Sequence, residues 1–142
     1  MIVEHRTLRC RTRGNDHIVD LTAALQAAIA ETGATTGQAA VLVEGSTAAL
    51  TTLEFEPGLV NHDIAAAMER LAPRDGPYLH EETWHDDNGH SHVRASTMGP
   101  SLALPIVDGR VPLGTWQQFV LVDFDTRPRD RTVHVSVVGV AG

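Results

Sequence analysis

Histidines gather in one short segment of the chain. Four of the eight histidines lie between His80 and His92, together with several Asp and Glu residues. Imidazole and carboxylate donors grouped in this way suit Zn, Mn, Ni or Fe, whereas a site lined only by oxygen favours Mg or Ca. The segment therefore predicts a divalent-metal site. The expected ion is zinc, and the expected ligands are His80, His90 and His92, ahead of His85.

The spacing of His90 and His92 leaves two arrangements open. On an extended segment, residues two apart share a side. On a helix they diverge by about 200°, and only one of them could then serve a compact site unless His90 precedes the first turn. The cluster matches no fixed zinc signature such as His-Glu-x-x-His. The plain alternative is a polar loop whose histidines act as caps or hydrogen-bond donors.

The balance of charge narrows the classes of protein to which the chain can belong. The formal net charge is −7, and all 11 cationic residues are Arg. Nucleic-acid binding is not expected, because neutralising phosphates requires a concentrated basic face. The Arg groups at residues 6–13 and 127–131 are expected on solvated edges or loops. The absence of Lys excludes Schiff-base and lysine-nucleophile mechanisms.

Length and composition predict a single domain over residues 1–142. Apolar residues make up 42% of the chain and charged residues 20%, which is the composition of a folded domain. The single cysteine, Cys10, excludes an internal disulfide. The first residues carry charge where a signal peptide needs an apolar run, and no stretch approaches the length of a membrane span. We therefore expect a cytoplasmic protein without a membrane partner.

The first third of the chain predicts a strand followed by a helix. Loose alternation of apolar and charged residues over 2–12 is typical of a strand with one solvated face. Asp16 is a plausible N-cap for the helix, which ends near Gly33. The apolar residues that fall on one face at helical spacing are Ile18, Leu21, Leu25, Ala28 and Ile29.

The middle third predicts further strands and a second helix. Residues 37–54 are rich in Val, Leu, Thr and Ala, and they predict two short strands or one kinked strand. A helix over about 60–71 follows, stopped by Pro73. Its buried residues are expected to be Ile64, Met68 and Leu71. The polar stretch from 73 to 89 has little periodicity and predicts a long loop, the connection that carries the histidines.

The last third predicts mainly strands. Residues 90–98 suit a short third helix closed by Gly99-Pro100. Residues 102–113 have the pattern of a hairpin around an Asp-Gly turn, and residues 116–124 and 132–138 predict two more strands. Strands that outnumber helices and mostly follow one another directly indicate an α+β fold. We expect packed mixed, largely antiparallel sheets with two to three helices.

Five stretches of the chain resemble the successive motifs of a known family. They are residues 45–54 (GSTAALTTLE), 56–60 (EPGLV), 80–92 with its closing DNGHSH, 98–101 (MGPS) and 113–118 (LGTWQQ). Because these motifs occur in order and the DNGHSH and GTWQ blocks are distinctive, the chain resembles the YjbQ-like family. The resemblance implies a YjbQ-like α+β fold, a homotrimer, a metal site at histidines and a secondary thiamine phosphate synthase activity.

The resemblance also assigns roles to individual residues. His80, His90 and His92 match the family's histidines and are the expected metal ligands. Catalytic roles fall to Glu54, Asp87 and Arg94. The residues expected to bind a small phosphorylated substrate are Ser46, Thr47, Asn88 and Arg94. Most of these have a simpler alternative: Glu54 as a surface carboxylate, Ser46 and Thr47 as strand hydroxyls, and Arg94 as a structural partner of a nearby Asp.

One position departs from the family's pattern. Many members have a histidine where this chain has Gly45; if that histidine contributes to the site in those members, the pocket here lacks one donor. Three functions therefore stay open: a thiamine phosphate synthase, a metal-binding or ligand-binding module without turnover, and a structural role in which the histidines stabilise the trimer. Product formation by metal-loaded protein distinguishes the first from the second, and a tightly held ion excludes the third.

Overall fold

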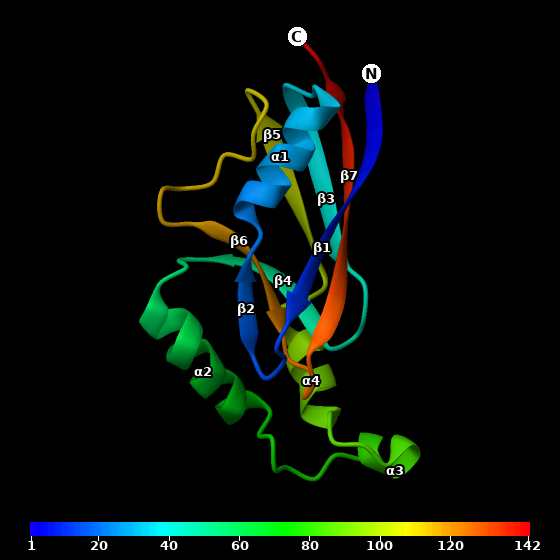
Figure 1. Ribbon diagram of the computed structural model, residues 1–142, viewed down its shortest axis with the longest axis vertical. Helices are drawn as coiled ribbons and strands as arrows, with labels where there is room; N and C mark the ends of the chain where they lie inside the picture. Colours follow the sequence, from blue (N-terminus) through cyan, green and yellow to red (C-terminus); the bar gives the residue numbers. More distant parts are fainter.

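Two antiparallel sheets and a set of short helices make up the fold of residues 1–142, which a computed structural model describes in full (Figure 1). The strands are β1 (Ile2–Thr12), β2 (His17–Asp20), β3 (Thr36–Val43), β4 (Ala48–Leu53), β5 (Ser101–Val107), β6 (Gln118–Asp123) and β7 (Arg129–Val140). The helices are α1 (Thr22–Thr32), η1 (Leu59–Asp63), α2 (Ile64–Leu71), α3 (His80–Trp84) and α4 (Gly89–Met98). The α+β expectation is confirmed.

The strands form one four-stranded and one three-stranded sheet. The first has the order β1-β7-β3-β5 and the second the order β2-β6-β4. Every pairing within them is antiparallel. The segment 37–54 supplies one strand to each sheet, because the chain crosses from β3 to β4 at Gly45-Ser46-Thr47.

The main core lies between the two sheets and is closed by α1. It includes Leu8 of β1, Leu25 and Ile29 of α1, Leu121 of β6 and Val135 of β7. A smaller core lies on the other face of the three-stranded sheet, where α2 and α4 pack. The central strand β6 is therefore buried on both faces, which explains its continuous apolar run. The outer face of the four-stranded sheet, on the right in Figure 1, has no helix over it.

The first helix begins later than the sequence predicts. Asp16 is not its N-cap: it lies in a turn with a positive φ of 68°, and residues 17–20 form β2 against β6. Ile18 is buried in this strand. The helix begins at Thr22, with Leu21 as its N-cap, and the Thr22 backbone N–H donates a hydrogen bond to the Asp20 carboxylate at 2.9 Å. The end is as expected, with Gly33 in the left-handed conformation.

Two further expectations need correction. The hairpin after Val107 has no second strand, because only one bridge, Val107 to Arg110, forms. The backbone N–H and C=O of Val111 bind the Gln26 side chain instead, and Pro112 has no N–H to donate. Leu71, at the last residue of α2, is 51% exposed, whereas Ile64 and Met68 pack on the smaller core as expected.

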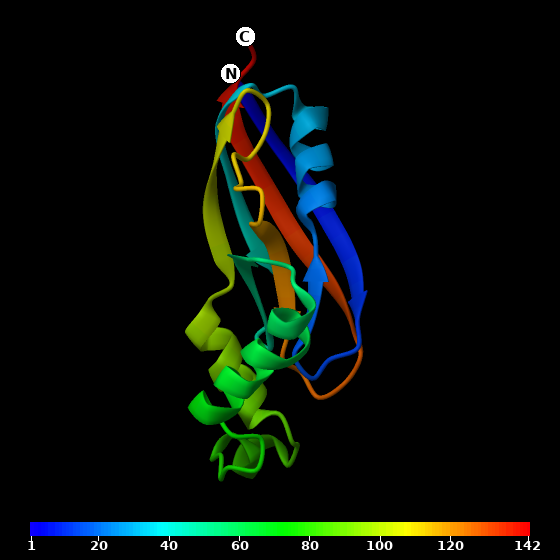
Figure 2. The same cartoon turned by 90° about the vertical axis from the view of Figure 1, so that its left-hand side faces the viewer.

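The histidine-rich elements lie at one end of the molecule. The two termini meet at the other end, and α3 and α4 occupy the end opposite to them (Figures 1 and 2). No helix has the length and apolar character that spanning a bilayer requires.

Candidate functional site

The long loop before α4 contains a short helix that was not predicted, α3, and this helix shapes the histidine-rich segment. It ends at His85, whose φ of 55° is left-handed. The Glu81 carboxylate accepts a hydrogen bond from the Gly89 backbone N–H at 2.8 Å, which ties α3 to the first residue of α4. A Cβ at position 89 would lie 2.6 Å from the same oxygen, so the close approach requires glycine.

His80 stands at the centre of a small group of metal-ligating side chains. Its Nδ1 lies 3.0 Å from Oε1 of Glu81 and 3.3 Å from Oδ1 of Asp86. One ligating atom from each of the three residues lies within 4.8 Å of the others. All three side chains are between a quarter and a third exposed, so the group is half-buried and reachable from solvent.

Of the other two predicted ligands, the structure brings His92 to this group and directs His90 elsewhere. The rings of His80 and His92 lie 4.4 Å apart between centroids. Both His90 and His92 belong to α4, where residues two apart diverge by about 200°. His90 lies instead beside Tyr78, with ring centroids 6.3 Å apart. Of the two arrangements left open by the sequence, the helical one is therefore found.

The electrostatic surroundings of the two histidines also differ. Burial, followed by the His80 ring, lowers the pKa of His92 below its ordinary 6.5. Burial and the guanidinium groups of Arg94 and Arg74 lower the pKa of His90. Both imidazoles are therefore neutral near pH 7, and only neutral imidazole can act as a ligand.

Unpaired buried polar atoms concentrate in the same segment. Four buried side-chain atoms have no hydrogen-bond partner, and all four lie within residues 86–91. They are Oδ1 of Asp86, Oδ1 of Asn88, Nδ1 of His90 and Oγ of Ser91. Such atoms are rare in folded proteins because a buried polar atom without a hydrogen bond is costly, so this concentration distinguishes the segment from the rest of the fold.

Arg94, predicted to act in catalysis and substrate binding, is already paired. It is almost fully buried, and its Nη1 donates to Asp16 at 3.0 Å and its Nη2 to Glu69 at 2.6 Å. Its Nε donates to the backbone carbonyl of Ala72. The simpler alternative was a structural pairing with Asp86 or Asp87; Arg94 is paired, but with Asp16 and Glu69. The guanidinium joins α4 to α2 and to the turn before β2.

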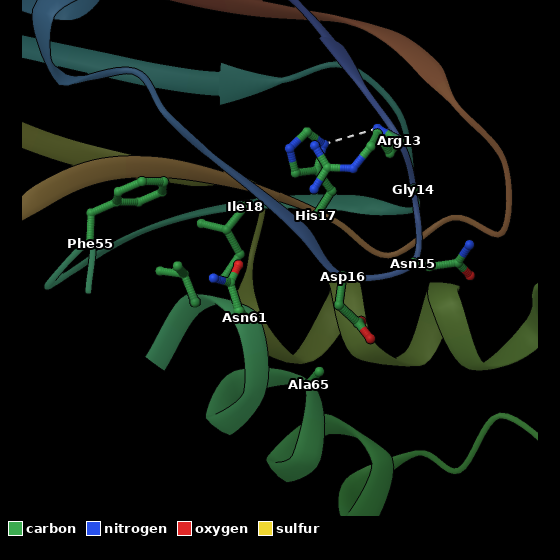
Figure 3. A pocket seen from close by; sticks show the side chains of 10 residues that line it. Arg13, Gly14, Asn15, Asp16, His17, Ile18, Phe55, Asn61 and Ala65 are labelled. Atoms are coloured by element: carbon green, nitrogen blue, oxygen red, sulfur yellow. Dashed lines mark hydrogen bonds between the residues drawn. The ribbon is translucent and has the colours of Figure 1, made fainter. Parts of the chain in front are cut away.

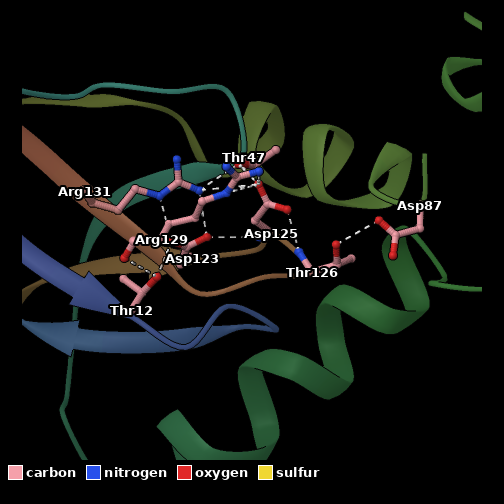
Figure 4. Close-up of polar contacts among 8 residues, drawn as sticks. All are labelled: Thr12, Thr47, Asp87, Asp123, Asp125, Thr126, Arg129 and Arg131. Atoms are coloured by element: carbon pink, nitrogen blue, oxygen red, sulfur yellow. Dashed lines mark hydrogen bonds and ion pairs between the residues drawn. The ribbon is translucent and has the colours of Figure 1, made fainter. Parts of the chain in front are cut away.

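Thr47, a predicted substrate ligand, belongs to a buried polar network that sequence reasoning missed (Figure 4). Its hydroxyl donates to Asp125 at 2.9 Å and accepts from Nη2 of Arg131 at 2.7 Å. Asp123, with no exposed surface, accepts two bonds from Arg131 and a third from the Thr12 hydroxyl. Arg131 was expected on a solvated edge and is buried. The sequence does carry a signal for this network. The apolar strand β6 ends at Asp123, Asp125 follows it, and Arg129 and Arg131 come shortly afterwards.

Asp87 connects this network to the histidine-rich segment. Its Oδ1 accepts a hydrogen bond from the Thr126 hydroxyl at 2.9 Å, and the Thr126 backbone N–H donates to Asp125 (Figure 4). Burial alone would raise the pKa of Asp125, but hydrogen bonds from Thr47 and Thr126 and the nearby Arg129 bring it below its ordinary value. Asp125 therefore stays ionised.

Gly45 and Ser46 lie beside the network, at the start of β4. Ser46 is exposed and shares an opening of about 340 Å³ with Ser96 and Pro100. Gly45 has a φ of 108°, and a Cβ there would lie 2.6 Å from Nη1 of Arg131. The glycine that departs from the expected histidine is thus the residue that leaves room for Arg131.

Glu54 lies far from the predicted ligands. It is exposed and follows β4 at the end opposite to Thr47, about 20 Å away at the usual rise per strand residue. Its neighbours in a shallow surface opening include Asp20 and Trp116. The structure does not bring Glu54 together with the histidines.

A cavity of about 540 Å³ opens between the turn before β2 and η1 (Figure 3). Arg13 and His17 line one side, and Phe55 and Val60 contribute apolar surface. The His17 Nδ1 accepts a hydrogen bond from the Arg13 backbone N–H at 2.9 Å. Asp16 borders the cavity and also pairs with Arg94. None of the predicted site residues lines this cavity.

Comparison with known proteins identifies the family. The family model described as UPF0047 protein YjbQ-like matches residues 6–140. The chain belongs to the YjbQ/UPF0047 family. Its relatives in this family include a UPF0047 protein of Methanothermobacter thermautotrophicus, 33% identical over 98% of this chain and 94% of the relative. The UPF0047 protein YugU of Bacillus subtilis is 32% identical over 94% of this chain and 98% of its own.

Solved structures of YjbQ/UPF0047 relatives share the fold. A YbjQ-like protein of unknown function from Sulfolobus solfataricus matches with a TM-score of 0.90 and 28% identity, covering 97% of this chain and 98% of the other. A family member from Clostridium acetobutylicum, described as uncharacterized, matches with a TM-score of 0.83 and 32% identity, over 94% and 99%. The family and the fold are therefore shown, and no function comes with them.

Proposed function

We propose that this chain binds a divalent transition-metal ion, with zinc as the expected ion, between α3 and the first turns of α4. The proposed ligands are the imidazoles of His80 and His92 and the carboxylate of Asp86. Mixed nitrogen and oxygen donors of this kind suit zinc and its neighbours in the transition series. Oε1 of Glu81 accepts a hydrogen bond from the Gly89 N–H and lies 3.0 Å from Nδ1 of His80, so this carboxylate also faces the proposed site.

The observation that carries the proposal is the concentration of unpaired buried polar atoms at residues 86–91. Oδ1 of Asp86 is one of them, and it lies beside His80. A bound cation would satisfy the Asp86 oxygen, and ordered water on that cation would suit the amide oxygen of Asn88. The lowered pKa of His92 adds support, because a proton then competes less with the metal.

Metal analysis of protein purified without an affinity tag tests the proposal. We expect one tightly held ion per chain, lost in both His80→Ala and His92→Ala. The matched control is His62→Ala, because His62 also pairs with a carboxylate, Asp63 at 2.8 Å, but has no second imidazole beside it. Retention of the ion by both His80→Ala and His92→Ala would refute the proposed site.

The role of His90 can be separated in the same experiment. If His80, His92 and Asp86 are the ligands, His90→Ala should retain the ion, because the His90 ring lies beside Tyr78 instead. The three-histidine site predicted from the sequence instead requires that His90→Ala lose it. Metal content of this single variant therefore decides between the two ligand sets.

A thiamine phosphate synthase activity is the second candidate, favoured by the partial exposure of His80 and Asp86, which a phosphorylated ligand could reach from solvent. In that reaction a carbon–nitrogen bond forms between the pyrimidine and the thiazole phosphate, and pyrophosphate leaves with the electrons of the broken carbon–oxygen bond. A bound metal would supply positive charge for the leaving group. Arg94 would add little, because two carboxylates already neutralise it.

Turnover separates an enzyme from a binding module. Steady formation of thiamine phosphate by zinc-loaded protein, abolished by His92→Ala, would support the enzyme. Saturable binding of the two phosphorylated substrates without product would support a module without turnover. Glu54→Gln should leave either result unchanged, because Glu54 lies at the far end of β4.

We also propose a homotrimer, as the family resemblance implies. Several large apolar side chains are exposed on the outer face of the four-stranded sheet, where strand pairing places them close together. They include Val3, Val138 and Val140. Exposed apolar groups of this kind often mark an interface. Light scattering coupled to size-exclusion chromatography should give three times the chain mass of 15.3 kDa.

A further inference from the structure

A second pair of histidines meets on the outer face of the four-stranded sheet, away from α3 and α4. Nε2 of His5 lies 2.9 Å from Nδ1 of His134. The two rings are stacked, with centroids 5.2 Å apart. His5 belongs to β1 and His134 to β7, which lie side by side (Figure 1). Neither residue belongs to the site described above.

Strand register explains why the two imidazoles meet. Thr7 faces His134 and His5 faces Ser136, so the histidines are diagonal neighbours. Side chains two residues apart on a strand share a face, and diagonal pairs are within reach of long side chains. The buried residues Val133 and Val135 alternate with His134 and point to the core, so His134 points outward. The antiparallel ladder thus fixes both rings on one face.

A carboxylate lies near the other ring nitrogen of His134. Oε1 of Glu44 lies 3.6 Å from Nε2 of His134, the nitrogen that does not face His5. Glu44 directly follows β3, and its backbone N–H bonds to Thr132 of β7. A carboxylate at this position favours a proton on Nε2, which leaves Nδ1 free to accept. Metal-binding histidines commonly donate their other ring N–H to a carboxylate, and a shift of less than about 1 Å would bring Glu44 to hydrogen-bonding distance.

We propose that His5 and His134 form a second binding site for a divalent transition-metal ion, with Glu44 orienting His134. The two facing nitrogens cannot both carry a proton without repulsion, and a cation can replace the proton that they share. Two imidazoles and water give a site that prefers zinc and its neighbours over magnesium. The site links β1 to β7 and lies on the same outer face as Val3 and Val138, so an ion there would lie beside the proposed subunit interface.

The test uses tag-free protein that carries His80→Ala and His92→Ala, so that the other proposed metal site is absent. Zinc is titrated against a chromophoric chelator at pH 7.5. We expect one equivalent of bound zinc per chain, and no competition from millimolar magnesium. Adding His5→Gln or His134→Gln should weaken zinc binding by at least about 10-fold, and Glu44→Gln by about 10-fold. Size-exclusion chromatography checks that the oligomeric state is unchanged.

The matched control is again His62, which is exposed and pairs with a carboxylate but not with a second imidazole. His62→Gln in the same background should leave zinc binding unchanged. Unchanged zinc binding in both His5→Gln and His134→Gln, or an equal loss in His62→Gln, would overturn the proposal. Failure of the site between α3 and α4 is a separate outcome, because the parent chain and the His80→Ala/His92→Ala chain would then bind equal amounts of zinc.

Discussion

Two polar clusters at the same end of the molecule are built in opposite ways. Around Asp123 and Arg131, the buried carboxylates accept several hydrogen bonds each. In residues 86–91, four buried polar atoms have no partner. Asp87 connects the two through Thr126. Buried polarity alone therefore does not mark a binding site: the satisfied cluster holds the two sheets together, and the unsatisfied one is where we propose the metal site.

The largest effect is expected where the satisfied cluster is broken. Asp123→Ala leaves the buried Arg131 guanidinium without its principal partner, and should lower the free energy of unfolding by about 3 to 5 kcal/mol. Urea denaturation checks this. Arg11→Ala is the control, because Arg11 pairs with Asp130 at an exposed position and should matter by less than about 1 kcal/mol. Equal losses in the two variants would contradict the structural role of the network.

Replacement of Arg94 should have the next largest effect on the free energy of unfolding. Arg94→Met keeps most of the side-chain volume but removes the bonds to Asp16 and to the Ala72 carbonyl. Unfolding free energy should fall by about 2 kcal/mol. Metal content should stay at the parent level, because Arg94 lies on the His90 side of α4. Loss of metal without loss of stability would instead indicate a direct role in the site.

Two hydroxyl deletions, one in each cluster, test whether the clusters differ in stability as described. Thr47→Val removes a hydroxyl that both Asp125 and Arg131 use, and should cost about 1 to 2 kcal/mol. Ser91→Ala removes a buried hydroxyl without a partner, and in metal-free protein should stabilise by about 0.5 kcal/mol. Urea denaturation in the presence of a chelator measures both. Effects of the same sign would mean that the two clusters do not differ as described.

The smallest effect concerns pH. Burial is the largest cause of the lowered pKa of His17, His90 and His92. The unfolded chain then binds more protons than the folded one as the pH falls past 6.5, so stability decreases with acidification. The urea midpoint should be lower at pH 5.5 than at pH 7.5, and His90→Gln should reduce that difference. An unchanged pH dependence would mean that His90 does not contribute.

Much of the fold could be predicted because long elements carry a repeated pattern. In β1, apolar and charged residues alternate over residues 2–12. The helix α1 ends at Gly33, because glycine readily adopts the left-handed conformation found there. The four-residue strand β2 was missed because its apolar residues also fit the helical spacing that follows. The second strand predicted for the hairpin after Val107 does not form, because a distant side chain, Gln26, forms hydrogen bonds with the backbone groups of Val111.

The site was predicted less completely than the fold. Composition identified the segment, and the meeting of His80 and His92 was expected. The roles of Glu81 and Asp86 depend on a short helix with little periodicity of its own. Thr47 and Arg94 look like binding residues in sequence, but their partners, Asp125 and Asp16, come from distant parts of the chain. Pairing over such separations has no local signal.

The glycine at position 45 constrains how this protein can change over evolutionary time. Any larger residue there would meet Nη1 of Arg131 at 2.6 Å, and Arg131 is fixed by Asp123 and Thr47. A histidine could therefore be accepted at position 45 only after the guanidinium had found another place. The two positions are epistatic, and the order in which they mutate determines which intermediates still fold.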